Sequence, residues 1–355
     1  MRLRRFVNSS ALLLVVALAA ALAAGSAEPQ KLWTPTGVPA APRPPASPNL
    51  PLVLGAIGGA YVVWTDLRTS ATTGSDAAIQ RLQPDGTIAP GWPAGGFLIS
   101  TFTSTQQPVT ISSDGLSGAL VFWDDTRNVP PGGNGDIYGL RVLSDGMLAP
   151  GWAVGGSPIC TAPNSQSMRA ASSAVEPPLA LADGSGGAIV VWRDLRDDPT
   201  NGSSPDVYAQ HVMGTGTLDP LWPAAGLPIC TAAGAQRSPQ IITDGAGGAI
   251  IAWDDERSGI AEVYALRLNL DGTLAPGWAA NGNLLVSASG HQFRPWIVPD
   301  GMGGALVAFQ DNRTNPGVPD PYAYIDLYAT RVTAAGGLAP GWPAGGVPIS
   351  TAPRA

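Results

Sequence analysis

An aspartate followed two positions later by an arginine recurs five times along this chain. The pairs are Asp66/Arg68, Asp125/Arg127, Asp194/Arg196, Asp255/Arg257 and Asp311/Arg313. A ring of carboxylates and guanidinium groups could grip an anionic or sugar ligand, because arginine forms paired hydrogen bonds with oxyanions. The alternative is a structural clamp, in which each arginine pairs across a loop with an acid on the next strand. Repetition in every copy favours the clamp, so we expect these residues to hold the repeat together.

The acid opposite each pair opens the following strand. These acids are Asp76, Asp136, Asp206, Glu262 and Asp326. General acid–base catalysis needs two carboxylates in different environments, so that one of them holds a proton. Symmetric copies predict equal environments for these acids, and the sequence therefore predicts no catalytic residue.

One loop of the third copy is rich in oxygen ligands. It contains Asp194, Asp197, Asp198, Asn201 and Asp206. Calcium prefers clustered oxygen ligands, although the spacing is not that of an EF-hand. Ca²⁺ is therefore the one cofactor that the sequence suggests, and a solvated acidic loop is the alternative. The two histidines, His211 and His291, lie in different copies and do not define a zinc site.

Aromatic and polar residues gather at the fourth and fifth copies. The group comprises His291, Phe293, Arg294, Asp320, Tyr322 and Tyr324. Aromatic rings beside polar groups suit the binding of a sugar or a peptide. We name this group as a predicted ligand-binding patch, with local loop packing as the alternative.

The elements that position these residues belong to a repeat of about 60 residues. The expected copies are 51–107, 108–174, 175–237, 238–293 and 294–355. Each copy contains four short strands, such as PQIIT, AIIAWDD and EVYALRLNL in the fourth copy and VPIS in the fifth. Repeats of four antiparallel strands predict an all-β protein, a β-propeller of about five four-stranded blades.

Loop lengths vary on one expected face of this propeller. Alternating strand directions place the loops between the second and third strands on the same face as the links between copies. The third copy has nine extra residues, which we assign to such a link, around 164–176. Insertions confined to one face often mark a binding face.

The N-terminus predicts export. Residues 1–27 have a basic start, an apolar stretch and small residues, which together indicate a secretory signal peptide. Residues 28–50 contain an extra copy of the fourth strand, Trp33 to Pro39, and a proline-rich linker before the propeller at 51–355. Five closed blades of four strands leave this extra strand without a place in the ring, so we call it spare. Either one copy lies outside the ring, or the chain is a piece of a longer array.

Composition limits the classes of partner and the cellular locations that we expect for this protein. A formal net charge of −7 with few lysines excludes a nucleic-acid binder. No other segment is long and apolar enough to span a membrane. We expect a secreted protein, extracellular or periplasmic, that is monomeric unless the spare strand pairs between chains. Cys160 and Cys230 occupy the same position in neighbouring copies, too far apart for a disulfide.

The repeat resembles one found in secreted bacterial β-propeller proteins, with the pattern DGxGGAIVxWxDxR…DIYAxRxxxxGxxxW. DGSGGAIVVWRDLR (183–196) and DIYGLRVLSDGMLAPGW (136–152) carry the resemblance. It implies a propeller fold and no particular activity. From these observations we predict a non-enzymatic extracellular protein that binds a glycan or a protein through the variable-loop face. The alternative is a propeller-type glycoside hydrolase or lyase.

Overall fold

The computed structural model describes residues 52–56, 58–128, 135–168, 178–198, 204–314 and 325–351. All of them belong to one compact unit, 39–355. The signal peptide predicted at 1–27 and the extra strand predicted within 28–50 lie outside the described residues. The described residues form strands and turns, without a helix.

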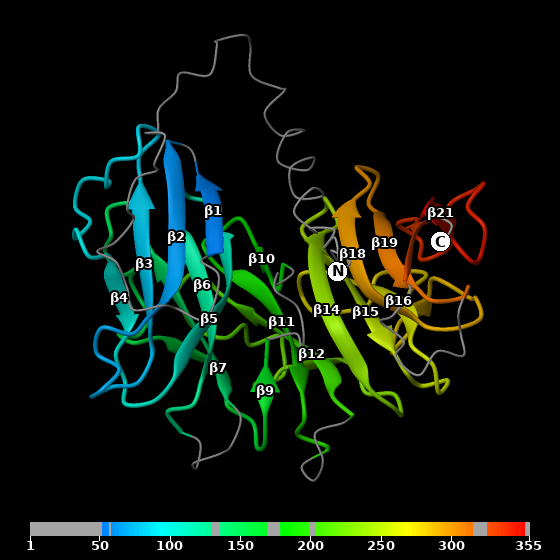
Figure 1. Cartoon of the computed structure of the whole chain (residues 1–355), viewed down its shortest axis with the longest axis horizontal. Helices are drawn as coiled ribbons and strands as arrows, with labels where there is room; N and C mark the ends of the chain where they lie inside the picture. The colour runs from blue at the N-terminus through cyan, green and yellow to red at the C-terminus, as the bar shows by residue number, and fades with distance from the viewer. Residues whose placement is uncertain are drawn as a thin grey trace, which may run out of the picture. The chain divides into compact units, whose positions relative to one another are not determined.

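The strands form five antiparallel sheets, which we call blades 1 to 5 (Figure 1). Blade 1 contains β1 (Leu52–Ala56), β2 (Gly59–Asp66), β3 (Asp76–Leu82) and β4 (Phe97–Ser100). Blade 2 contains β5 (Gln106–Ser113), β6 (Ala119–Asp125), β7 (Asp136–Val142) and β8 (Ser157–Cys160). Blade 3 contains β9 (Gln166–Ser167), β10 (Ala180–Ala182), β11 (Ala188–Asp194), β12 (Asp206–Val212) and β13 (Leu227–Cys230).

Blade 4 contains β14 (Gln236–Thr243), β15 (Ala249–Asp255), β16 (Glu262–Leu268) and β17 (Asn283–Leu284). Blade 5 contains β18 (Gln292–Pro299), β19 (Ala305–Asp311), β20 (Asp326–Val332) and β21 (Val347–Ser350). Within each blade four strands pair in chain order, and in blade 3 the short β9 pairs with β11 beside them. The prediction of an all-β propeller with five four-stranded blades is confirmed.

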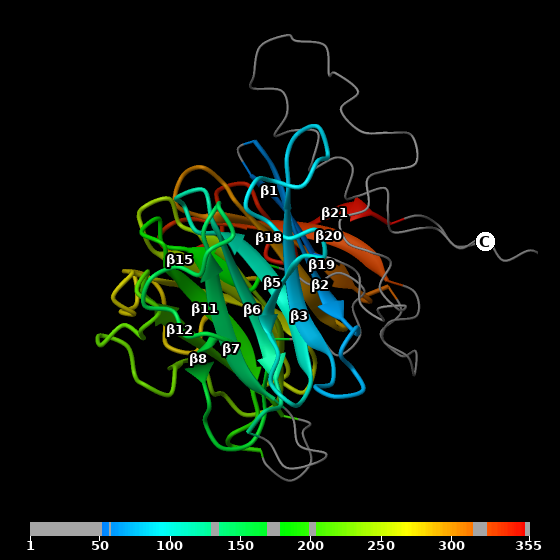
Figure 2. The ribbon, with the colours of Figure 1, turned by 90° about the vertical axis from the view of Figure 1, so that its left-hand side faces the viewer.

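Successive blades pack against each other through their first strands. The first strand of one blade lies against strands of the blade before it: β5 on β1, β2 and β3 (Figure 2), and β18 on β14, β15 and β16 (Figure 1). This packing explains why the second strands are apolar on both faces. In blade 4, Ile250 and Ile251 point to opposite faces, and both are fully buried.

Blade 3 departs from the pattern in its first strand. Both β9 and β10 pair with β11, through Ser167 opposite Arg193 and Ala180 opposite Val190. The residues between them, 169–177, lie outside the described residues. The extra residues of the third copy therefore interrupt the first strand itself. The prediction that they lengthen the link between copies is wrong, because Gln166 already pairs with Asp194 at the strand's start.

Candidate functional site

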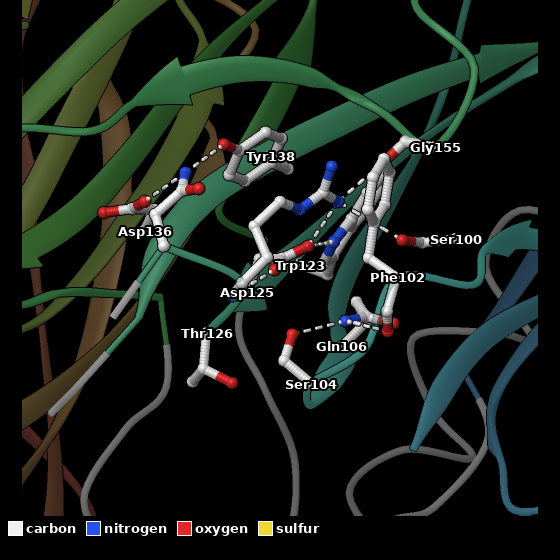
Figure 3. A network of polar contacts seen from close by, with 12 residues as sticks. Ser100, Phe102, Ser104, Gln106, Trp123, Asp125, Thr126, Asp136, Tyr138 and Gly155 are labelled. Carbon is white, nitrogen blue, oxygen red and sulfur yellow. Dashed lines mark hydrogen bonds and ion pairs between the residues drawn. The ribbon is translucent and has the colours of Figure 1, made fainter. Parts of the chain in front are cut away.

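Trp123 and Asp125 belong to a polar network in blade 2 (Figure 3), and the centre of this network is the guanidinium of Arg127. Its Nη2 donates to Asp125 Oδ2 at 2.5 Å, and the same carboxylate accepts a 2.8 Å bond from Trp123 Nε1. The guanidinium carbon lies 3.9 Å from the ring centre of Phe102 and 4.0 Å from that of Tyr138. Asp125 is fully buried. A buried carboxylate is tolerated when its partners satisfy it, as they do here.

The same aspartate–arginine clamp occurs in every blade. The ion pairs are Asp66–Arg68, Asp125–Arg127, Asp194–Arg196, Asp255–Arg257 and Asp311–Arg313. In blades 2 to 5 the arginine also donates to a main-chain carbonyl before its own fourth strand: Gly155, Ala225, Asn281 and Gly345. Each arginine thus pairs with the aspartate two residues earlier. The predicted pairing across the loop is wrong, because the arginine folds back onto its own strand end.

The two cysteines are free and buried. Arg196 Nη2 donates to Cys160 Sγ at 3.5 Å, and Arg257 Nη2 donates to Cys230 Sγ at 3.1 Å. Burial raises the pKa of Cys160 to about 11 and that of Cys230 to about 12. Both side chains are therefore neutral thiols at pH 7, and they connect a clamp to the preceding blade.

A second set of ion pairs lies at the opposite end of blades 2 to 5, at the turns between the first and second strands. The pairs are Asp114–Arg141, Asp183–His211, Asp244–Arg267 and Asp300–Arg331. Each aspartate also accepts bonds from two turn amides, as Asp114 does from Leu116 and Gly118. An aspartate whose carboxylate accepts bonds from amides that follow it is typical of a turn.

Blade 3 has a histidine where its neighbours have arginine. His211 Nδ1 lies 2.8 Å from Asp219 Oδ2, and Nε2 lies 3.1 Å from Asp183 Oδ2. Burial lowers the pKa of His211, but the hydrogen bonds to the two carboxylates outweigh it, and the net pKa is raised. Asp219 stands where the other copies have alanine: Ala89, Ala149, Ala275 and Ala339. This paired departure was visible in the sequence and was missed.

The histidine makes the stability of blade 3 depend on pH. Because its folded pKa is raised, the ion-pair contribution is complete below the unfolded pKa of about 6.5 and is lost as pH rises through the folded pKa. We expect His211→Arg/Asp219→Ala, which restores the pattern of blades 2, 4 and 5, to remove this loss. From pH 6 to pH 9 the wild type should lose about 1 kcal/mol more unfolding free energy than the variant. Urea unfolding at both pH values measures the difference, and parallel losses would refute it.

The acids that open the third strands are not in equal environments. Three of them accept hydrogen bonds from the loop before them: Asp76 from Thr69 and Thr73, Asp136 from Asn128, and Asp326 from Thr314. Among the described residues, no hydrogen bond reaches the carboxyl of Asp206. The prediction of equal environments, and with it the argument against a catalytic carboxyl, is wrong for blade 3.

Asp206 is surrounded by other carboxylates. Its side chain is 8% exposed, and Asp206 pairs in register with Asp194, whose carboxylate already binds Arg196 and Trp192. Burial, followed by the charges of Asp197 and Asp194, raises the pKa of Asp206 to about 7. The pKa of Asp136 is also raised by burial, against a hydrogen bond from Asn128. Asp206 can therefore hold a proton near neutral pH.

The predicted ligand patch at blades 4 and 5 is only partly within the described residues. Asp320, Tyr322 and Tyr324 lie outside them. His291 Nδ1 accepts a bond from the amide of Ala261, and the amide of Arg294 donates to Asp254. Phe293 is buried. His291 and Arg294 thus connect blade 5 to blade 4, and ligand binding at the patch stays a prediction.

The predicted calcium ligands lie at the end of β11, in the loop that follows it and at the start of β12. Asn201 is outside the described residues. The carboxylate of Asp194 already binds Arg196, and Asp198 accepts a hydrogen bond from the amide of Ser204. In the part of the chain that the structure describes, no group of three or more His, Cys, Asp or Glu side chains is arranged to hold a metal ion. Calcium binding stays an untested prediction.

A repeated glutamine at the start of the first strand was missed. It is fully buried in four blades: Gln106, Gln166, Gln236 and Gln292. Its side-chain amide donates into the preceding link, as Gln106 does to Ser104 Oγ and to the Phe102 carbonyl (Figure 3). Its backbone amide bonds to the residue before the third strand of the previous blade, as Gln106 does to Ser75. The signal was a glutamine at one position in four copies.

No protein-family model and no curated protein matches this chain. Among solved structures it is similar to an ulvan lyase of polysaccharide lyase family 25, with 12% identity, a TM-score of 0.48, and coverage of 87% of this chain and 74% of that one. It is also similar to an α-L-arabinofuranosidase from Lactobacillus brevis, with 11% identity, a TM-score of 0.40, and coverage of 85% and 95%. An endo-1,4-β-xylanase from Bacteroides thetaiotaomicron gives 10% identity, a TM-score of 0.37, and coverage of 81% and 92%.

These solved structures are named as enzymes that act on carbohydrates. That finding overturns the prediction of a non-enzymatic binding protein and agrees with its alternative. The likeness itself is one of fold, so the case for catalysis depends on the residues of this chain. No helix among the described residues is long and apolar enough to cross a membrane.

Proposed function

We propose that the protein is an exported propeller-type glycoside hydrolase with Asp206 as its general acid. The observation that carries the proposal is the buried carboxyl of Asp206, which faces other carboxylates and, unlike Asp136 and Asp326, accepts no hydrogen bond from the described part of its loop. The signal-peptide pattern at 1–27 supports export to the cell exterior or the periplasm. The substrate is a glycan.

Hydrolysis of a glycosidic bond needs a carboxyl that is protonated at the working pH. The acid gives its proton to the glycosidic oxygen as the bond from that oxygen to the anomeric carbon breaks. Water then adds to the anomeric carbon, and a second carboxylate takes the proton that this water loses. An ordinary aspartate has a pKa near ~3.9 and is a poor acid at pH 7.

The arrangement in blade 3 meets the first requirement. Burial and the charges of Asp197 and Asp194 raise the pKa of Asp206 to about 7, so a large share of the carboxyl is protonated at neutral pH. Perturbed carboxyls of this kind concentrate at active sites. We assign the second role to Asp197, because its side chain is exposed to water and its charge acts strongly on Asp206.

The test is turnover of glycans by wild type and by Asp206→Asn. We expect the purified protein to release reducing ends from at least one of arabinan, xylan, ulvan or a sialylated glycan. Asp206→Asn should lower kcat about 10²–10⁴-fold, the usual contribution of a general acid. Wild-type activity should fall as pH rises through about 7, because the acid form of Asp206 is lost.

Asp326→Asn is the matched control, because Asp326 holds the same position in blade 5 and is bonded by Thr314. We expect this variant to keep wild-type activity. No turnover on any substrate, or equal losses in the two variants, would overturn the proposal. Products with unsaturated uronic acid ends, measured by ultraviolet absorbance, would identify a lyase in place of a hydrolase.

A further inference from the structure

One face of blade 5 exposes large apolar side chains. Trp296 is 44% exposed, Val298 48%, Leu306 37% and Ile349 58%. They lie on three strands of the blade, β18, β19 and β21. Side chains that alternate with them, such as Phe309 at 1%, face blade 4 and are buried. A continuous apolar face of this kind marks an interaction surface.

The same positions are buried in blades that have a following blade. Trp296 pairs with Ala308 as Gln240 pairs with Ala252, so Trp296 and Gln240 are equivalent. In blade 4 the equivalents of Trp296, Val298 and Leu306 are Gln240, Ile242 and Ile250, which are 3%, 8% and 0% exposed. Gln240 Oε1 accepts a bond from the amide of Ile297 in blade 5. The exposed face is therefore an inter-blade surface.

Polar groups on this face also lack their usual partners. Four tryptophans donate Nε1 to a carbonyl of the following blade: Trp92 to Ser144, Trp152 to Gly214, Trp222 to Leu270 and Trp278 to Ala334. Trp342, the fifth, has no such acceptor among the described residues. Asp124 and Asp254 accept amide bonds from the next blade, whereas Gln310 Oε1, at the equivalent position, has no described partner.

Blade 1 offers the complementary surface. Val62 is half-buried, whereas its equivalents in the other blades are fully buried: Val121, Val190, Ile251 and Val307. The acceptor carbonyls Ser144, Gly214, Leu270 and Ala334 stand two residues after a third strand, and in blade 1 that position is Pro84. Pro84 is exposed, and no described donor reaches its carbonyl. Among the described residues, no strand of blade 1 makes extensive contact with a strand of blade 5.

We propose that blade 5 of one copy of this chain docks on blade 1 of a second copy. The contact would repeat the inter-blade packing seen four times within the chain. Leu306 and Trp296 would pack on the side of blade 1 that contains Val62, and Trp342 Nε1 would donate to the Pro84 carbonyl. The two surfaces differ, so the interface is head-to-tail and builds a ring or a filament.

Sedimentation velocity over a concentration series tests the interface. We expect wild type to form species larger than a monomer as concentration rises, and Leu306→Asp and Val62→Asp each to remain monomeric. Leu221→Asp is the control, because Leu221 is 70% exposed on blade 3, away from both surfaces. It should assemble like wild type. Thermal melting of each variant checks that it is folded.

Mixing the two variants gives a sharper test. Leu306→Asp keeps an intact blade 1 surface and Val62→Asp keeps an intact blade 5 surface, so the mixture should form a heterodimer and nothing larger. Wild type that stays monomeric at every concentration would overturn the proposal, since it indicates closure within one chain or no contact. A mixture that stays monomeric, or an equal effect of Leu221→Asp, would also overturn it.

Discussion

Asp255→Ala should lower the unfolding free energy by about 3–5 kcal/mol, as expected when one partner of a buried ion pair is removed. The carboxylate of Asp255 is fully buried and accepts bonds from Trp253 Nε1 at 2.9 Å and from Arg257 Nη2 at 2.6 Å. Without it, the guanidinium stays near the thiol of Cys230 and the ring of Tyr264 with no counter-charge. Urea denaturation at pH 7 measures the loss.

The neighbouring acid gives the matched control. Glu256 pairs with Arg237 at 2.6 Å, but its side chain is 39% exposed. Glu256→Ala should therefore lower stability by at most ~1 kcal/mol. Burial raises the pKa of Asp255, but the hydrogen bonds from Arg257 and Trp253 together lower it by more. The net pKa therefore lies below its usual value. The wild-type advantage is present above the unfolded pKa and should shrink as pH falls through the folded pKa. Similar losses in the two variants would show that the clamp contributes little.

The fold could be predicted because short sequence signals mark the strands and turns of each repeat. Asp-Gly turns, an apolar run that ends in Trp-x-Asp and a strand that begins with an acid occur in nearly every copy, so the strand count and pairing followed. The extra residues of the third copy were placed wrongly because the start of its first strand, β9, is only two residues long. β9 pairs only with the last two residues of β11. A short pairing of this kind gives no periodic signal in sequence.

The site was harder to predict because it depends on differences between copies. The five third-strand acids look alike in sequence, and only the loop donors before them separate Asp206 from Asp326. Thr314 is adjacent to a clamp arginine, and its bond to Asp326 depends on the path of the loop. The clamp partner was misjudged for a similar reason. Sequence shows that Arg127 has two acids within reach, and the backbone of the loop selects Asp125.

Function in a repeat protein is therefore expected where one copy departs from the others. Blade 3 has His211 with Asp219 at one end and Asp206 without a described donor at the other. His211 stands where the other blades have arginine, and burial together with nearby carboxylates raises the pKa of Asp206 to about 7. The departures of blade 5 are of another kind, since Trp296 and Leu306 differ from their equivalents in exposure.

Gly282→Ala should lower stability by about 3–5 kcal/mol, because it combines backbone strain with overpacking. Gly282 has a φ of 83°, a conformation that alanine adopts at a cost of about 1–2 kcal/mol. An added Cβ would lie 2.4 Å from Cη2 of the buried Trp253 ring. Gly247→Ala separates the two effects, because Gly247 has a φ of 94° but nothing within 4 Å of an added Cβ. Gly247→Ala should lower the free energy of unfolding only by the cost of the backbone strain.

A double-mutant cycle then isolates the contact with the tryptophan. Blade 5 has Phe309 in place of tryptophan, so the repeat tolerates a smaller ring above this glycine. We expect Trp253→Phe to destabilise the protein alone but to recover about 1–2 kcal/mol of the loss in the Gly282→Ala background. Urea unfolding of the four proteins of the cycle gives the coupling energy. Strictly additive losses, or equal losses in Gly247→Ala and Gly282→Ala, would show that ring contact does not explain the glycine.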